Sequence, residues 1–270
     1  MSDTLANPAL DSVDRPTTSR TPVLATTGLS VIVPLFNEEE CASLVVESLS
    51  RLEQSLAGKR QLEFLLVDDG SADDTVSLLE QAIGERSNFV ILRHVQNRGI
   101  AAAICTGLAA ASYEVVASID CDGSYDVGEL EEMTEMLVPG VDLVTASPYH
   151  PQGSVDNVPE WRLRLSRLAS RLYATAIGRP LTCYTCCFRV YRRSAVVNLP
   201  LANPGFVGVA ELLCRLLQEG GSVVEHPARL QARVAGHSKM RVARAALGHL
   251  RLIRQLAFRR FLRRAPPAID

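Results

Sequence analysis

Two aspartates stand two residues apart at the end of a short apolar stretch of this 270-residue chain. Asp120 and Asp122 follow residues 115–119, which are small or β-branched, and Gly123 comes directly after the pair. In an extended segment, residues two apart point to the same side, so both carboxylates can face one point. Like charges at that distance repel unless a positive charge lies between them. We therefore predict that the pair holds Mg²⁺ or Mn²⁺, since such hard cations take carboxylates, water and phosphate as ligands.

An isolated Asp-x-Asp can also be a solvated turn, because motifs this short occur by chance. The rest of the chain argues against that reading. The predicted strand 29–34 leads into Glu38, and the predicted strand 62–67 leads into Asp69. In open parallel sheets, ligands bind at the carboxyl ends of the strands. We therefore expect the three polar clusters to lie at one edge of one sheet and to form one site.

Short apolar runs alternate with helical patterns along most of the chain, which predicts an α/β fold with a mostly parallel sheet flanked by helices. The long stretch 147–160 contains three prolines and a glycine, so it is expected to be an irregular and functional loop. The other expected strands are 89–92, 115–119, 141–145, 185–190, 223–227 and 230–234, and the expected helices are 37–55 (capped by Asn37), 73–83, 100–112, 129–138, 161–177, 209–219 and 239–263.

The chain divides into three expected parts. Residues 1–28 are polar and aperiodic, which predicts a disordered leader. Residues 29–238 are expected to form one folded domain that carries the predicted site, and residues 239–270 a basic C-terminal helix and tail. That helix carries arginines on one side and apolar residues on the other, a pattern typical of helices at membrane surfaces. A helix packed on the domain with a charged outer face is the alternative.

Composition limits the partners and the compartment. The net charge of −2 predicts no nucleic-acid partner. No signal peptide or apolar run of roughly 18 residues is recognisable, so we expect no membrane-spanning anchor and a cytoplasmic location, or a peripheral one at the inner membrane face. The seven cysteines form no disulfide pattern. Cys183, Cys186 and Cys187 lack a second Cys/His pair at metal spacing, which favours core packing over zinc or redox chemistry.

Several segments together resemble family 2 glycosyltransferases, whose fold is the Rossmann-like GT-A type. These are Val-Pro-Leu-Phe-Asn-Glu at 33–38, Val-Asp-Asp-Gly-Ser at 67–71 and Asp-Cys-Asp-Gly at 120–123. The segments 187–193, 205–207 and 233–239 resemble, more narrowly, the dolichol-phosphate mannose synthase and polyprenyl-phosphate glycosyltransferase branch. The likeness extends from about residue 29 to residue 249.

The resemblance implies a site for a nucleotide-sugar donor. It implies that Asp69 accepts hydrogen bonds from the base or ribose. It also implies that the ribose, the metal and the diphosphate contact Asp120, Cys121 and Asp122. Arg233 and Lys239 would hold phosphate. The nucleotide pocket would be lined by Pro34, Phe36, Glu38, Val67 and Asp69. The mannose synthases carry an arginine near the metal at the position of Pro148, and Arg162 or Arg164 are candidates to replace it here.

The implied reaction is an in-line displacement with inversion, from a GDP- or UDP-sugar to a lipid phosphate. A phosphate acceptor is already anionic and needs no base, whereas a sugar hydroxyl needs a positioned carboxylate. Related hydroxyl-glycosylating enzymes often carry two acids where this chain has only Glu211, which favours phosphate and leaves Glu211 as the base for a hydroxyl acceptor. A catalytically silent nucleotide-sugar-binding protein is the third hypothesis, and Pro148 is compatible with it.

Overall fold

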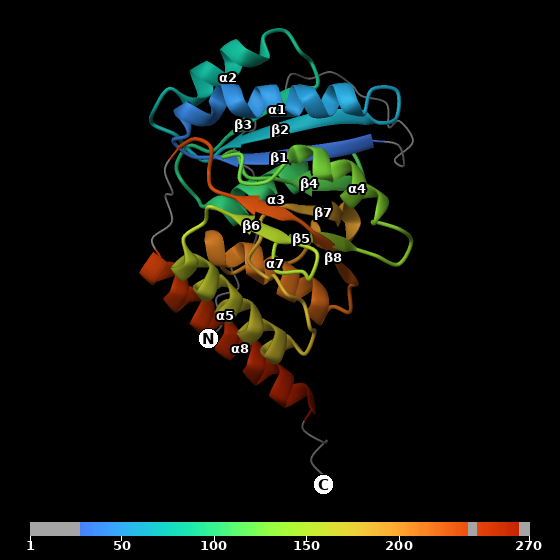
Figure 1. The fold of residues 1–270 in the computed structure, drawn as a ribbon, viewed down its shortest axis with the longest axis vertical. Coiled ribbons are helices and arrows are strands. Elements are labelled where there is room, and N and C mark those ends of the chain that lie inside the picture. The colour runs from blue at the N-terminus through green and yellow to red at the C-terminus, as the bar shows by residue number, and fades with distance from the viewer. Residues whose placement is uncertain (1–27, 237–241, 265–270) are drawn as a thin grey trace.

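The computed structural model describes residues 28–236 and 242–264, with side chains up to residue 260. One seven-stranded sheet in the order β3-β2-β1-β4-β7-β5-β8 forms the centre (Figure 1). Its strands are β1 (Gly28–Leu35), β2 (Gln61–Asp68), β3 (Phe89–Arg93), β4 (Val115–Ser118), β5 (Leu143–Ser147), β7 (Arg189–Arg192) and β8 (Val223–Pro227). Only β7 runs antiparallel to its neighbours β4 and β5. The predicted mostly parallel α/β sheet is therefore confirmed.

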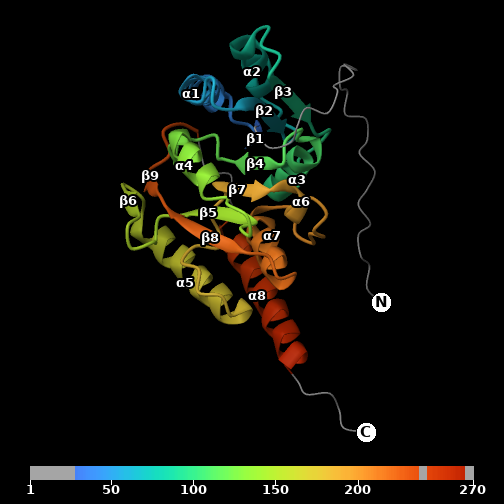
Figure 2. The ribbon, with the colours of Figure 1, turned by 90° about the vertical axis from the view of Figure 1, so that its right-hand side faces the viewer.

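Helices cover both faces of the sheet (Figure 2). The helices α1 (Ala42–Ser55), α2 (Thr75–Ile83) and α4 (Leu130–Glu135) pack on one face. The opposite face carries α3 (Ile100–Ala110), α5 (Glu160–Ile177), α7 (Phe206–Gln218) and α8 (Val242–Arg264). Every residue of β1 is buried, as expected of a central parallel strand covered on both sides. The short elements are α6 (Arg193–Val196) and the 3₁₀ turns η1 (Glu39–Cys41) and η2 (Val127–Glu129).

The loop after β1 differs from its prediction. Asn37 does not cap a helix: its backbone is left-handed, with φ 52°, and its side-chain oxygen accepts from the Ala72 N–H at 2.8 Å. Its own N–H donates to Ser71 Oγ at 2.8 Å. Asparagine tolerates this conformation and makes such turns readily. The helix accordingly starts late, after η1, and the loops following β1 and β2 are fastened together.

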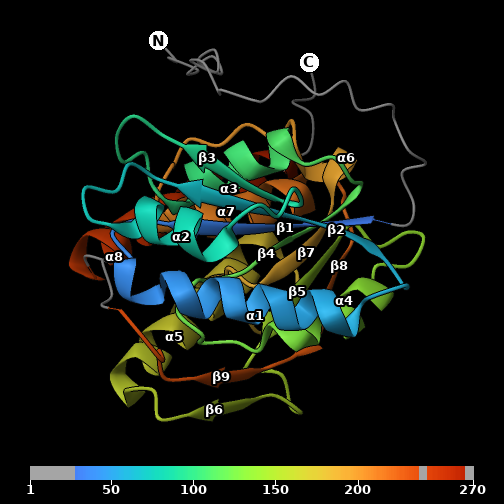
Figure 3. The same cartoon turned by 90° about the horizontal axis from the view of Figure 1, so that it is seen from above.

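Two further predictions are corrected in the part of the chain that follows β5. Part of the expected loop 147–160 forms β6 (Ser154–Asp156), which pairs in parallel with β9 (Arg229–Gln231) as a separate ribbon beside α5 (Figure 3). The strand expected at 185–190 starts only at Arg189. Within the missing part, the Cys187 carbonyl accepts from the Ser118 hydroxyl at 2.5 Å, so a side chain is its partner there.

Helix α8 packs along α5 and α7 (Figure 1). Its Leu252 and Leu256 are 3% and 2% exposed and belong to the core on that face of the sheet. No helix in the described ranges has the length and apolar character that would let it cross a bilayer. Lys239 and the residues 1–27 and 265–270 lie outside the described part of the chain.

Arg189 is one of the largest fully buried side chains in the described residues, and it ties β7 to two other segments. Its Nη1 donates to the Val209 carbonyl at 2.6 Å, and its Nη2 donates to the Tyr184 carbonyl at 2.8 Å. Hydrogen bonds from a charged donor are strong, and a buried acceptor left unpaired is costly. This arginine therefore fixes α7 against the sheet.

We predict that Arg189→Met lowers the free energy of unfolding by about 3 kcal/mol, because two buried carbonyls lose a charged donor. The neighbouring Arg192→Met is the matched control. Its side chain is 31% exposed, it lies 4.0 Å from Asp142, and its hydrogen bonds to three carbonyls are long, at 3.3–3.5 Å, so it should cost less than about 1 kcal/mol. Urea unfolding followed by circular dichroism measures both values. Equal losses in the two variants would contradict the role given to Arg189.

Candidate active site

The loops after β1, β2 and β4 start at the same edge of the sheet. The three strands are adjacent in the order β2-β1-β4. Just beyond them, the Asp69 N–H donates to the Leu35 carbonyl at 2.8 Å, and the Ile119 N–H donates to the Ile32 carbonyl at 3.0 Å. The polar segments that follow these strands therefore emerge side by side, as the sequence predicted.

Arg233 joins two carboxylates from different loops. Its Nη2 lies 2.9 Å from Asp122 Oδ2, and its Nη1 lies 3.3 Å from Glu38 Oε1. Both carboxylates are buried, with Asp122 5% and Glu38 6% exposed. The Val234 N–H donates to the Asp122 carbonyl at 2.9 Å, which holds the arginine's segment against the acidic loop. The guanidinium thus offsets negative charge gathered at the rim.

Asp120 shares this crowded rim. Burial, above all, and the charge of Asp122 raise the pKa of Asp120 from 3.8 to about 7. A hydrogen bond with Cys187 and the charge of Arg233 act in the opposite direction but do not cancel the rise. Deprotonated Asp120 therefore lacks sufficient positive charge nearby, and its oxygens are hard ligands. The two aspartates fit a Mg²⁺ or Mn²⁺ ion.

The other predicted nucleotide residues surround the same edge. Pro34 and Val67 are partners in the β1–β2 register, and both are buried. Phe36 is half-buried just beyond β1, and Cys121 is buried between the two aspartates. Their contacts with a nucleotide remain predictions.

Asp69 is 3% exposed and already bonded inside the protein. Its Oδ1 accepts from the Arg98 N–H at 2.8 Å and its Oδ2 accepts from the Gly99 N–H at 2.7 Å. Its Oδ1 also lies 2.6 Å from His94 Nδ1. These bonds fix the loop that precedes α3. The predicted contact of Asp69 with a base or ribose stays a prediction, and the sequence did not anticipate His94 as its partner.

Glu211 does not reach the rim. Its side chain is fully buried, and Oε2 accepts from the Asn203 N–H at 2.9 Å. Its Oε1 lies 2.9 Å from Arg215 Nη2. Both oxygens are therefore used to fasten the loop before α7. A carboxylate without exposed atoms is not placed to take a proton from an acceptor hydroxyl, so the geometry speaks against Glu211 as a base.

A cavity of about 450 Å³ opens from the aspartates between α5 and α8, and we call it the α5–α8 groove. Asp120, Asp122 and Arg233 line its inner end, and apolar residues line most of the remainder. Trp161, Leu165, Leu168, Phe206 and Leu250 in its walls are between 42% and 54% exposed. The sequence did not predict this groove, because apolar residues at helical spacing, as on α5, normally indicate a core face.

The two arginines that are candidates to replace the missing arginine at Pro148 lie in different places. Arg162 lines the α5–α8 groove together with Pro148 and the aspartates. Arg164 pairs with Glu160 on the helix surface, where its side chain is 78% exposed. Of the two candidates to replace the missing arginine, only Arg162 therefore faces the site. The cysteines Cys183, Cys186 and Cys187 are buried free thiols, as the prediction of core packing requires.

Comparisons with known proteins agree with this arrangement. The family model for glycosyl transferase family 2 matches residues 30–199. The polyprenol monophosphomannose synthase of Mycolicibacterium smegmatis is 31% identical over 217 residues, which cover 78% of this chain and 80% of the relative. The undecaprenyl-phosphate 4-deoxy-4-formamido-L-arabinose transferase of Pseudomonas fluorescens is 32% identical over 169 residues, 62% of this chain. The match spans 48% of that longer relative.

A solved structure has the same fold. It is the glucosyl-3-phosphoglycerate synthase of Mycobacterium tuberculosis, crystallised with Mn²⁺, UDP and phosphoglyceric acid. It aligns with a TM-score of 0.65 and 21% identity over 87% of this chain and 79% of that one. The sheet and its acidic rim thus define an α/β protein of the GT-A type. The chain belongs to glycosyl transferase family 2 and is a glycosyltransferase.

We predict that Mn²⁺ binds more weakly as the pH falls below about 7, because the cation must then displace a proton from Asp120. The apparent dissociation constant should rise by up to about tenfold per pH unit below that point and level off above it. Electron paramagnetic resonance of free Mn²⁺ measures this constant. Asp120→Asn should bind weakly at every pH, and a flat profile in the unaltered chain would contradict the raised pKa.

In the metal-free protein, the raised pKa of Asp120 makes the folded state less stable as the pH rises. The folded state holds the Asp120 proton more tightly than the unfolded state does. The contribution of this group to stability is therefore lost as the pH rises from about 4 to about 7.

Proposed function

We propose that the chain transfers a sugar, with inversion, from a GDP- or UDP-sugar to the phosphate of a polyprenyl phosphate. The α5–α8 groove is the observation that carries this proposal. It joins a charged inner end, with Asp120, Asp122 and Arg233, to a long apolar remainder. A polyprenyl phosphate has the matching form, because its phosphate suits the charged end and its chain gains from burial against apolar side chains. The names of the relatives from Mycolicibacterium smegmatis and Pseudomonas fluorescens refer to lipids of this class.

The donor's diphosphate would lie between the acidic pair and Arg233. Asp120 and Asp122 would hold a divalent cation, which when bound offsets the charge of the leaving diphosphate. Arg233 uses one nitrogen for Asp122 and another for Glu38, and its side chain is still 31% exposed. A guanidinium has five N–H donors, so some remain for phosphate oxygens. Lys239, outside the described residues, is predicted to assist.

The position of Glu211 bears on the chemical class of the acceptor. Glu211, the acid considered as a base, is buried and bonded to Arg215 and the loop before α7. A phosphate oxygen is already anionic near neutral pH and needs no base. Arg162 lines the groove and supplies a positive charge for such an acceptor. These features favour phosphate over a hydroxyl as the acceptor.

Asp122→Asn tests the reaction directly. We expect the transfer of radiolabelled sugar to a long-chain polyprenyl phosphate to fall about 10²- to 10³-fold, because the leaving group loses electrostatic stabilisation. Asp126→Asn is the matched control, since Asp126 is an exposed cap of η2 in the same loop and should retain activity. An unaltered chain that binds nucleotide sugars without any transfer would support the silent binding protein. Transfer to a saccharide hydroxyl instead of the lipid would contradict the acceptor.

Leu250→Gln tests the groove. Leu250 lines it from α8 and is 54% exposed, so it is available to a lipid chain. We expect kcat/KM for a long-chain acceptor to fall about fivefold, the equivalent of about 1 kcal/mol of lost apolar contact, while a one-isoprene phosphate is unaffected. Leu247→Gln changes a leucine of similar exposure on the same helix that does not line the groove, and both variants are assayed with the acceptor in neutral detergent so that membrane binding plays no part. Equal effects of the two variants on the long acceptor would contradict this lipid path.

The outer face of α8 is suited to a membrane surface, which would place the enzyme at the inner membrane face beside its lipid substrate. Leu247 and Phe258 are exposed there, outside the groove. The exposed arginines of the same helix are Arg244, Arg251, Arg254 and Arg259. Apolar residues bordered by basic ones are typical of helices that lie in the interface of anionic bilayers.

We predict that replacing Arg251 and Arg254 together by serine weakens binding to anionic vesicles about 30-fold, since each basic residue contributes about 1 kcal/mol near such a surface. Replacing Arg51 and Arg93, which are exposed on α1 and β3, is the control. Co-sedimentation with vesicles containing and lacking anionic lipid measures the partition. Identical sedimentation of both double variants would remove the membrane surface from the proposal.

A further inference from the structure

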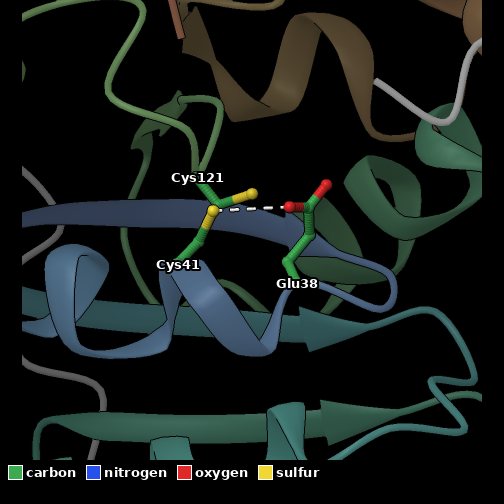
Figure 4. Close-up of side chains that lie close together, drawn as sticks. All are labelled: Glu38, Cys41 and Cys121. Carbon is green, nitrogen blue, oxygen red and sulfur yellow. Dashed lines mark hydrogen bonds between the residues drawn. The ribbon is translucent and has the colours of Figure 1, made fainter. Parts of the chain in front are cut away.

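Three buried side chains lie close together in a cluster, and one of them, Cys121, stands between the two aspartates in the sequence (Figure 4). Glu38 and Cys41 come from the segment that follows β1, and Cys121 comes from the loop after β4. One oxygen of Glu38 and the two sulfurs all lie within 4.8 Å of one another. The exposed fractions of Glu38, Cys41 and Cys121 are 6%, 0% and 8%. Two sulfurs and a carboxylate from distant parts of the chain thus face one point.

We propose that Glu38, Cys41 and Cys121 form a binding site for a thiophilic divalent cation of the Zn²⁺ or Cd²⁺ class, distinct from the Mg²⁺ or Mn²⁺ ion assigned to Asp120 and Asp122. Tetrahedral zinc binds sulfur at about 2.3 Å and carboxylate oxygen at about 2.0–2.2 Å, so its ligand atoms lie about 3.5–3.8 Å apart. The separation of Cys41 Sγ and Glu38 Oε2 is 3.3 Å, which a small side-chain adjustment brings into that range. Thiolates select such cations over Mg²⁺ and Mn²⁺.

Arg233 orients the carboxylate of the cluster. It binds Glu38 Oε1, while Oε2 faces Cys41 Sγ. Partners of this kind hold a ligand in position and are part of most metal sites. The charge also balances, because a divalent cation with two thiolates and one carboxylate carries a net charge of −1 next to the guanidinium. Cys41 lies at the start of α1, where the helix dipole favours an anion.

The cluster has a cover and an entrance. A Cβ atom on Gly236 would lie 2.4 Å from Glu38 Oε2 and 3.0 Å from Cys41 Sγ, so the backbone there closes directly over the ligands. Its φ of 73° also suits glycine. A cavity of about 330 Å³ lined by Glu38, Asp73 and Gly236 opens on the same side. Glu38 is the member of the cluster that lines this cavity, so a cation would reach the sulfurs past its carboxylate and would keep one water as its fourth ligand.

Binding would release two thiol protons to solvent as two metal–sulfur bonds form. Binding adds no net charge, because two protons leave as the cation enters, but it would fix Cys121 and so restrict how Asp120 and Asp122 on either side of it adjust around Mn²⁺. If the proposed function holds, Zn²⁺ should therefore raise the Mn²⁺ concentration needed for half-maximal transfer. The cluster is then an inhibitory site that senses thiophilic metal.

The test is a titration of the reduced, metal-free chain with Cd²⁺, followed by the near-ultraviolet thiolate-to-cadmium absorption. We expect one Cd²⁺ per chain and an affinity that falls at least about tenfold in Cys41→Ser and in Cys121→Ser. Cys183→Ser is the matched control, because Cys183 is also buried, lies near Cys186 and is outside the cluster. Thermal unfolding establishes that each variant is folded, and either cluster variant alone suffices for the comparison.

Absence of the absorption band, or a band lost in Cys183→Ser but kept in Cys41→Ser, would overturn the proposal. In the transfer assay, Cys41→Ser should keep its activity and lose inhibition by Zn²⁺. A chain that shows the cadmium band but no transfer would refute the proposed function and leave the cation site standing.

Discussion

The ion pairs of Arg233 with Asp122 and Glu38 are the interaction on which the rest of the site depends. Buried carboxylates from separate loops repel each other, and their association is unfavourable without a cation. Arg233 is the only basic side chain within 4.0 Å of either carboxylate in the described residues. It comes from a segment more than 100 residues after Asp122, so the rim is completed only when the C-terminal part has folded onto the sheet. Even so, the raised pKa of Asp120 indicates that the negative charge is incompletely offset.

The sheet determines where this charge can gather and where an acceptor can approach. The order β2-β1-β4 aligns the carboxyl ends of three parallel strands. The antiparallel β7 then carries Arg189 under α7, and the helices α5 and α8 extend from that face as the walls of the groove. A donor site at the rim and an apolar path leading away from it are therefore two consequences of one arrangement. The thiol cluster beneath Arg233 is a third.

The sequence was sufficient for features that depend on local pattern. Alternating apolar and helical segments predicted the sheet, and the placement of Glu38, Asp69 and Asp120 after strands predicted the common edge. Features that depend on distant partners were not predictable in this way. Asn37 does not cap the following helix, because its N–H and its side-chain oxygen form hydrogen bonds with Ser71 and Ala72 instead.

Burial made the remaining difference between prediction and structure. An acid at Glu211 looks available in the sequence, but tertiary contacts with Asn203 and Arg215 bury it. The apolar face of α5 has the spacing of a core helix, and only the position of α8 leaves Leu168 exposed to a groove. No local pattern distinguishes these outcomes, because each is decided by segments far away in the chain.

The most direct test of the account is the affinity for UDP and GDP, measured by calorimetry with and without Mn²⁺. If the acidic pair and Arg233 hold a cation bridged to a diphosphate, Mn²⁺ should tighten the preferred nucleotide by at least about tenfold, or 1.4 kcal/mol. Asp122→Asn should abolish that gain. Nucleotide affinities that are the same with and without Mn²⁺, or a gain that persists in Asp122→Asn, would contradict the central claim.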